Sequence, residues 1–322
     1  MLELHFINVG DGDAVLIEEQ DGSHVFRMLV DTGRQDVEGS SDSLRCTAAE
    51  YLRGRGVSHI DVLVVTHLHT DHFGGLEELL QEVTVDQVYS GFFPAHPEAR
   101  LPQEPDAPKT VRGLIECLNQ WGADVETMTA KGCRFHAVTS TVFGLPLTER
   151  LSADLICPDE EKAAVQRRAW KRMLSGEPVP EEVKYWSAKH RNPGSLRVRL
   201  EFAGRAVELA GDCCGPAWDN EDQRPCDILK VPHHGAGGAL TEAQMGRLRP
   251  LYAVISCGSE YIPRKDRPSG ELIGQLRRQG ARIWFTDSFS APNQEPEHWT
   301  SVDFTIFEDG TILTPDNRES GR

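Results

Sequence analysis

The sequence lacks the features that place a protein in a membrane or in an export pathway. No apolar run approaches about 18 residues, so a membrane span is not expected. Residues 1–7 contain no basic segment before a long apolar one, and they predict a first β-strand rather than a signal peptide. The eight cysteines form no Cys-x-x-Cys pair, which favours reduced thiols. We therefore predict a cytoplasmic protein with no membrane partner.

Positive charge is also scarce. The chain has 34 lysines and arginines against 50 acidic residues, which gives a net charge of −16. Because long nucleic acids bind mainly through neutralisation of their phosphates, this balance argues against a surface that coats DNA. It does not exclude a nuclease, since bound metal ions reverse the charge at the site itself.

Short apolar segments alternate with turns and helical patterns along all 322 residues. The expected strands cover residues 2–8, 14–19, 25–30, 60–66, 196–202, 206–210, 227–231, 253–256, 282–285, 302–307 and 311–313, with others near 125, 135 and 155. The expected helices cover 43–55, 76–82, 110–121, 159–174, 241–248 and 269–279, and 175–192 is expected to be irregular. Two halves of similar style predict an α/β fold with two sheets covered by helices on both outer faces.

The densest chemical pattern is His67-Leu68-His69-Thr70-Asp71-His72, directly after the apolar strand 60–66. On extended backbone, His67 and His69 face the same side and can reach one ion. Asp71 and His72 follow where the chain bends into a helix, so they can face a second ion. Imidazole and carboxylate suit zinc, manganese or iron. The alternative is a polar loop with incidental histidines, and the spacing favours the metal site.

Two further strand ends carry polar residues. Asp212 follows the strand 206–210, and its two oxygens could bridge two cations. His233 and His234 follow the strand 227–231. We prefer His234 as a ligand and expect His233 to face the substrate or to support the site. The alternatives are that Asp212 is an ordinary turn aspartate and that His233 and His234 lie in a polar loop.

These residues together resemble the metallo-β-lactamase superfamily. Within it they are most similar to the ComEC-like branch, whose founding members carry the nuclease domain of bacterial DNA-uptake channels. The resemblance rests on Phe6-Ile7-Asn8-Val9-Gly10-Asp11-Gly12-Asp13, Leu29-Val30-Asp31-Thr32-Gly33, residues 61–75, Asn192-Pro193-Gly194-Ser195-Leu196, Gly211-Asp212, Leu229-Lys230-Val231-Pro232-His233-His234-Gly235 and Thr286-Asp287.

The resemblance implies a four-layer αββα sandwich, here a single domain over residues 1–322 with insertions near 159–191 and 288–301. It implies two divalent ions, zinc or manganese. The first would be held by His67, His69 and Asp212, and the second by Asp71, His72, Asp212 and His234. Many members have a further histidine in mid-chain for the first ion, and no histidine stands in a matching context here.

Several residues around this pattern are predicted to act on the substrate or to support the ligands. Asn192 and Ser195 stand near the place of the missing histidine, and Arg267 precedes Pro268 where the family often has histidine. With the basic Lys230, these residues are predicted to bind substrate; Lys189 and Arg191 are further basic candidates. Asp13 and Asp31 are predicted to support the site from behind the ligands.

The favoured function is a two-metal hydrolase that activates a water molecule near neutral pH. Asp212 would hold both ions, Asp71 would orient the nucleophile, and His233 is the third predicted catalytic residue. A small phosphodiester is the favoured substrate, such as a nucleotide or short single-stranded nucleic acid. The alternatives are an ester, lactone or amide hydrolase, a non-catalytic metal-binding module, and a flavo-diiron-like redox protein, which the lack of a flavin domain disfavours. The oligomeric state stays open.

Overall fold

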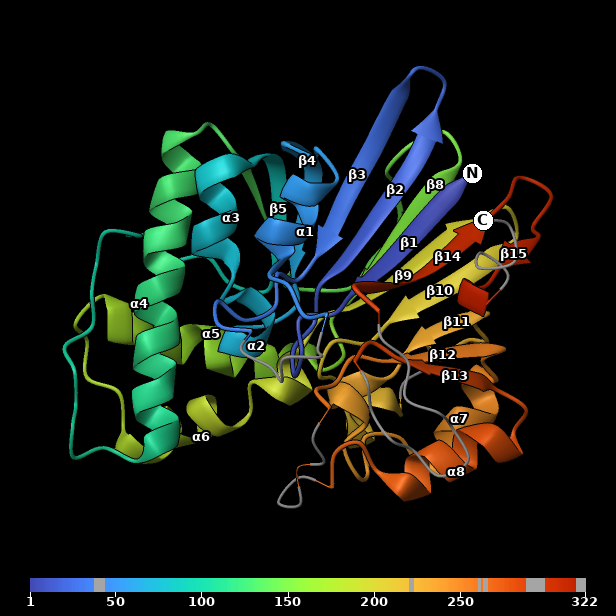
Figure 1. Cartoon of the computed structure of the whole chain (residues 1–322). Coiled ribbons are helices and arrows are strands. Elements are labelled where there is room, and N and C mark those ends of the chain that lie inside the picture. Colours follow the sequence, from blue (N-terminus) through green and yellow to red (C-terminus); the bar gives the residue numbers. More distant parts are fainter. Residues whose placement is uncertain (38–43, 220–222, 260–261, 263–265, 288–298, 317–322) are drawn as a thin grey trace.

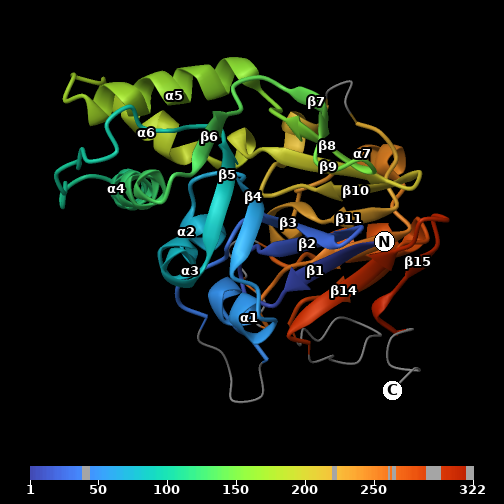
Figure 2. The same ribbon diagram turned by 90° about the horizontal axis from the view of Figure 1, so that it is seen from above.

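The computed structural model describes residues 1–37, 44–219, 223–259, 262, 266–287 and 299–316, and the structural statements that follow refer to these. Its strands form two sheets (Figures 1 and 2). The first sheet has the order β15-β14-β1-β2-β3-β4-β5-β6. Its strands are β1 (Leu2–Ile7), β2 (Val15–Asp21), β3 (His24–Val30), β4 (His59–Val65), β5 (Thr84–Ser90), β6 (Arg134–Ala137), β14 (Ser301–Ile306) and β15 (Ile312–Leu313).

The second sheet is drawn mainly from the other half of the chain and has the order β13-β12-β11-β10-β9-β8-β7. Its strands are β7 (Val142–Pro146), β8 (Leu151–Ile156), β9 (Arg197–Phe202), β10 (Arg205–Leu209), β11 (Ile228–Lys230), β12 (Tyr252–Ile255) and β13 (Arg282–Phe285). The predicted hairpin between β9 and β10 is present, with Ala203 and Gly204 at its turn.

Alternation of apolar residues along the strands creates the layers. On β4, Val62 and Val64 face the core between the sheets, whereas Leu63 and Val65 face the helices outside. A third apolar core lies on the far side of the second sheet. The helices outside the first sheet include α1 (Ala48–Gly54), α3 (Leu76–Glu82) and α4 (Lys109–Ala130), and those outside the second are α7 (Glu242–Leu248) and α8 (Gly270–Arg278). The predicted α/β class and four-layer αββα sandwich are confirmed.

Two segments that were predicted not to be helical are helices. Val125 was expected in a strand, but it lies in α4, where it continues the buried face formed by Leu118 and Trp121. The stretch expected to be irregular contains α6 (Glu181–Lys189), which packs with α5 (Glu160–Leu174) beside α4 (Figure 2). α6 also packs on α4, which is remote from it in the sequence, so local pattern alone did not reveal α6.

Other segment predictions have mixed outcomes. The cap of α1 is Thr47, which forms a capping box with Glu50; the predicted cap, Ser43, lies outside the described residues. Most of the predicted insertion at 288–301 also lies outside them. The single domain over 1–322 and the insertion at 159–191 stay predictions. None of the described helices is long and apolar enough to cross a membrane.

Parallel strands bring the polar segments to one edge of the sandwich. β3 pairs with β4, and β10 with β11, in parallel, so the carboxyl ends of each pair lie at the same edge. Asp31 follows β3, the histidine cluster follows β4, Asp212 follows β10, and the two adjacent histidines follow β11. This is the edge at which α/β sheets generally place their ligand sites.

Candidate metal centre

The histidine cluster changes from extended to helical backbone within six residues. His69 is extended, with φ −120° and ψ 146°, and it precedes the short helix α2 (Thr70–Phe73). His67 and His69 therefore lie on one side, with Nε2 of His67 2.9 Å from Nδ1 of His69. Asp71 and His72 leave from the first turn of α2 in a different direction, as the sequence predicted.

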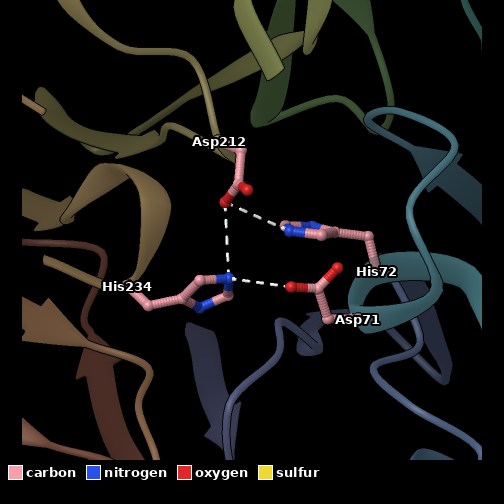
Figure 3. Close-up of side chains that lie close together, drawn as sticks. All are labelled: Asp71, His72, Asp212 and His234. Atoms are coloured by element: carbon pink, nitrogen blue, oxygen red, sulfur yellow. Dashed lines mark ion pairs between the residues drawn. The ribbon is translucent and has the colours of Figure 1, made fainter. Parts of the chain in front are cut away.

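The Asp212 carboxylate lies between two groups of donor atoms, and Figure 3 shows the group that it forms with Asp71, His72 and His234. Its Oδ1 is 3.1 Å from Nε2 of His72 and 3.4 Å from Nε2 of His234. His234 Nε2 is also 3.6 Å from Oδ2 of Asp71. On the other side, Asp212 Oδ2 is 3.9 Å from Nε2 of His67.

We call these sets the first donor group (His67, His69, Asp212) and the second donor group (Asp71, His72, Asp212, His234). In each, one ligand atom per residue lies within 4.8 Å of every other. The two groups share only Asp212, which is 1% exposed. The structure thus brings together the six residues that the sequence predicted as metal ligands.

The second donor group contains buried polar atoms that other protein atoms do not satisfy. Among the described residues, His72 Nε2, Asp212 Oδ1 and His234 Nε2 accept or donate no aligned hydrogen bond, although they lie close together. Buried polar atoms without partners are rare and costly in native proteins. Because these atoms converge and belong to imidazoles and carboxylates, the donor set fits a divalent cation.

Each imidazole is oriented by a partner on its other side. Nδ1 of His72 bonds to Oδ2 of Asp31 at 2.7 Å, and Asp31 in turn accepts bonds from the amide and hydroxyl of Thr66. Nδ1 of His234 bonds to the Ser256 carbonyl at 3.0 Å. Such partners fix the ring orientation and the tautomer in metal sites. Asp31 therefore lies where the sequence predicted, behind a ligand.

Asp13 is the second residue predicted to support the site. Its Oδ1 lies 3.4 Å from Nδ1 of His234, and its Oδ2 pairs with the ammonium group of Lys230. Burial opposes the ionised form of Asp13, but Lys230 and then His234 lower the pKa of this carboxyl to about 2. Asp13 is therefore a buried anion between Lys230 and the second donor group.

The pKa values of the histidines also differ between the two donor groups. Burial, and then the neighbouring His72, lower the pKa of His67 well below its ordinary value, and burial followed by Arg191 lowers that of His69 to about 3. Burial opposes the charged form of His72 too, yet Asp212 and the other carboxylates raise its pKa well above normal. The carboxylates of the second donor group therefore favour positive charge at this point, which imidazolium protons or a bound divalent cation can supply.

Strained backbone holds the two adjacent histidines. His233 and His234 have φ values of 50° and 54°, in the left-handed region that costs roughly 1–3 kcal/mol for each such residue. This conformation separates their side chains. His234 is fully buried in the second donor group, whereas His233 is 22% exposed, with Nε2 3.7 Å from Asp212 Oδ2 and 3.2 Å from Nδ2 of Asn192.

Three of the four residues predicted to bind substrate are placed elsewhere. Lys230 is 1% exposed and pairs with Asp13, and Arg267 is 2% exposed and pairs with Asp11. Ser195 is also buried, and its hydroxyl lies 3.3 Å from Nδ1 of His67. Their substrate-binding role stays a prediction, and in the structure each of these side chains is buried against a partner.

Asn192 and the other basic candidates have different positions. Asn192 is only partly buried, and its Nδ2 donates to Oδ2 of Asp212 at 2.8 Å, so it lies at the open side of the first donor group. Lys189 is exposed on α6. Arg191 is buried, and its Nη1 donates to the Leu68 carbonyl at 2.7 Å, which secures the turn between His67 and His69.

Sequence reasoning missed three of these supporting residues. Thr66 bonds both oxygens of Asp31, Ser256 orients His234, and Asp11 neutralises Arg267. Thr66 had a usable signal, because a polar residue ends an otherwise apolar strand next to the cluster. Ser256 acts through its backbone carbonyl, so its side chain gave no signal.

The sequence and the fold of this chain are similar to those of known proteins. Residues 7–115 match the family model described as the metallo-beta-lactamase superfamily. ComE operon protein 3 of Bacillus subtilis (strain 168) is 23% identical over 314 residues, which cover 88% of this chain and 32% of that protein. The chain thus spans about a third of the length of this curated relative.

Two solved structures are also similar over much of the chain. The metallo-beta-lactamase fold protein YhfI of Bacillus subtilis has a TM-score of 0.45 and 10% identity, covering 88% of this chain and 96% of its own. The short form of human tRNase Z has a TM-score of 0.35 and 15% identity, covering 98% and 99%. Neither score bears on the substrate. Residues 7–115 of the 322-residue chain thus match the metallo-β-lactamase superfamily, whose members are typically metal-dependent hydrolases that bind divalent metals, often zinc.

Proposed function

We propose that the protein is a two-metal phosphodiesterase that acts on a small or short substrate. The observation that carries the proposal is the position of Asp212, whose two oxygens face two different donor groups. A carboxylate in that position can hold two cations side by side. Zinc and manganese are the proposed ions, because imidazole with carboxylate suits both.

In this proposal His67, His69 and Asp212 hold the first ion. The second ion is held by Asp71, His72, Asp212 and His234. Two such ions, when bound, supply Lewis-acid stabilisation of the substrate and a nucleophile that forms near neutral pH.

The remaining chemistry belongs to side chains of this chain. The free carboxylate oxygen of Asp71 orients the nucleophile by accepting its hydrogen bond. His233 has a partly exposed ring beside Asp212, so it can transfer a proton to the leaving oxygen. Asn192 holds Asp212 Oδ2 and lies next to His233, which restricts where the substrate can enter.

Local charge supports an anionic substrate. The donor groups contain two carboxylates, Asp71 and Asp212, whose two negative charges face the four positive charges of two divalent ions. The excess positive charge favours a phosphodiester over a neutral ester or amide. The chain's net charge of −16 favours a nucleotide or short single-stranded nucleic acid over a long duplex. A cytoplasmic location and the absence of a membrane partner belong to the same proposal.

The test is hydrolysis of a chromogenic bis-aryl phosphodiester by metal-stripped protein refilled with manganese or zinc. Asp212→Asn keeps the shape of the side chain and removes its charge, and Asp106→Asn, an exposed aspartate, is the matched control. We expect turnover that requires metal, is lost in Asp212→Asn and is retained in Asp106→Asn.

A parallel assay with an aryl ester and a lactone tests the rival substrates. Turnover of these alone would replace the phosphodiester with a carboxylic ester or lactone as the substrate. Two bound ions without turnover of any of the three would leave a non-catalytic metal-binding module.

A further inference from the structure

A second cluster of metal-binding residue types lies at the other end of the same strands. His24 begins β3, His59 begins β4, Asp61 lies on β4, and Asp86 lies on β5. Nε2 of His59 is 3.7 Å from Oδ1 of Asp61 and 3.6 Å from Oδ2 of Asp86. Nε2 of His24 is 3.5 Å from the same Oδ1 of Asp61.

These separations are close to those of ligands around one ion. Ligand atoms bound to zinc at about 2.0–2.1 Å in a tetrahedron lie roughly 3.4 Å from one another. The measured separations of 3.5, 3.7 and 3.6 Å need only small adjustments of exposed side chains. His59, Asp61 and Asp86 each offer one ligand atom within 4.8 Å of the other two, and His24 lies next to Asp61; imidazole and carboxylate suit zinc and similar borderline cations.

Other contacts aim the ligand atoms at this point. Nδ1 of His59 bonds to the hydroxyl of Thr84 at 3.0 Å, which leaves Nε2 directed at the carboxylates. Oδ2 of Asp61 accepts the Arg27 amide at 2.8 Å, which leaves Oδ1 directed at the imidazoles. Each of the two central residues thus uses one polar atom to fix its position and presents the other to the cluster, as ligands in metal sites do.

The sheet register supplies an independent reason for a cation. Because Ile60 pairs with Val85 and Val62 with Gln87, Asp61 and Asp86 are direct neighbours on adjacent strands. Like charges in this position repel each other. In the described part of the chain neither carboxylate forms an ion pair with a lysine or arginine, and the guanidinium of nearby Arg27 pairs with Glu18 instead.

We propose that His59, Asp61 and Asp86, with His24 beside Asp61, form a second, separate binding site for a zinc-class divalent cation. β4 runs from this cluster toward the candidate metal centre, and its seven residues at about 3.3 Å each place the two sites roughly 20 Å apart. The site joins β3, β4 and β5 at the ends opposite the catalytic edge. Its ion stabilises the sheet and takes no part in hydrolysis.

The test is the number of zinc ions bound per chain, measured by equilibrium dialysis with elemental analysis, together with the Tm in zinc and in chelator. The variants are Asp86→Asn and His59→Gln, with Asp106→Asn as the control. We expect both variants to bind one zinc ion fewer than the wild type and the control, and to lose part of the zinc-dependent rise in Tm.

The chelator arm separates metal binding from folding. Asp86→Asn removes the repulsion with Asp61, so its Tm in chelator should equal or exceed that of the wild type. Equal zinc content and an equal zinc-dependent rise in Tm in either variant would overturn the site. Phosphodiester hydrolysis should be unchanged in both variants, so the outcome here is independent of the outcome for the proposed function.

Discussion

The two donor groups on either side of Asp212 are built differently. In the second donor group, His72 is backed by the carboxylate of Asp31, and His234 is backed by the Ser256 carbonyl and by Asp13. In the first, His67 is backed by neutral hydroxyls, and His69 contacts His67 itself. A carboxylate behind an imidazole makes that ligand more basic. The comparison therefore predicts tight binding of the second ion and weaker binding of the first.

The largest effect is expected from the residue that both groups share. Asp212→Asn should lower turnover by more than about 100-fold, because even partners behind the ligands contribute 10–100-fold. The free energy of unfolding in chelator should also fall at neutral pH: burial opposes the ionised form of Asp212, but His72 and then His234 hold its pKa well below the usual value, so its charge stabilises the folded state. Metal content and turnover should be measured on the same sample; full activity with two bound ions would refute the shared role.

The next effect separates the groups. His72→Ala should remove the second ion and most activity, whereas His69→Ala should lower the affinity for the first ion and leave the second bound. Titration with zinc after chelation, with metal content at each step, distinguishes the two variants. If His69→Ala removes the tightly bound ion instead, the order of affinities proposed here is reversed.

A smaller effect is expected from the residues behind the ligands. Asp31→Asn keeps the left-handed backbone conformation at φ 58°, which asparagine tolerates, but removes the charge behind His72. We expect a loss of about 10–100-fold in affinity for the second ion. Ser195→Ala, which removes a hydroxyl behind His67, should weaken the first ion only, by less than about 10-fold. Similar losses in both variants would erase the difference between the groups.

The smallest effect is expected at the open side of the first donor group. Asn192→Ala removes the amide that donates to Asp212 Oδ2. Because Asn192 is only partly buried, we expect a loss of less than about 10-fold in kcat/KM, at about 1 kcal/mol for one hydrogen bond. A change confined to KM would indicate contact with the substrate, and a change confined to kcat would indicate that Asn192 orients Asp212.

Local sequence patterns were enough to predict β4, the histidine cluster that follows it and the layers of the fold. The apolar run of β4 followed by three histidines and an aspartate gave both the strand and the cluster, because strand burial and ligand spacing are local properties. The αββα layers also followed from alternating strands and helices. The length of α4 did not, since valine is enriched in strands and only the burial of Val125 on the apolar face of the helix accounts for its place there.

The sequence did not reveal which acids neutralise two buried basic residues, because the partners are remote in the sequence. Lys230 pairs with Asp13 over 217 positions, and Arg267 pairs with Asp11 over 256. A sequence shows that a basic residue is present but not which acid neutralises it after folding. The sequence analysis gave His234 and His233 different places, but it did not reveal the two consecutive left-handed residues that separate their side chains.

The origin of the ligands has a consequence for folding. Asp71 and His72 follow a strand of the first sheet, whereas Asp212 and His234 follow strands of the second. A cation bound to all four residues would link the two sheets at their common edge, beyond the end of the apolar core between them. Its binding free energy then adds to the cohesion of the two halves of the sandwich. Metal supply would therefore set the mechanical and proteolytic resistance of this protein as well as its chemistry.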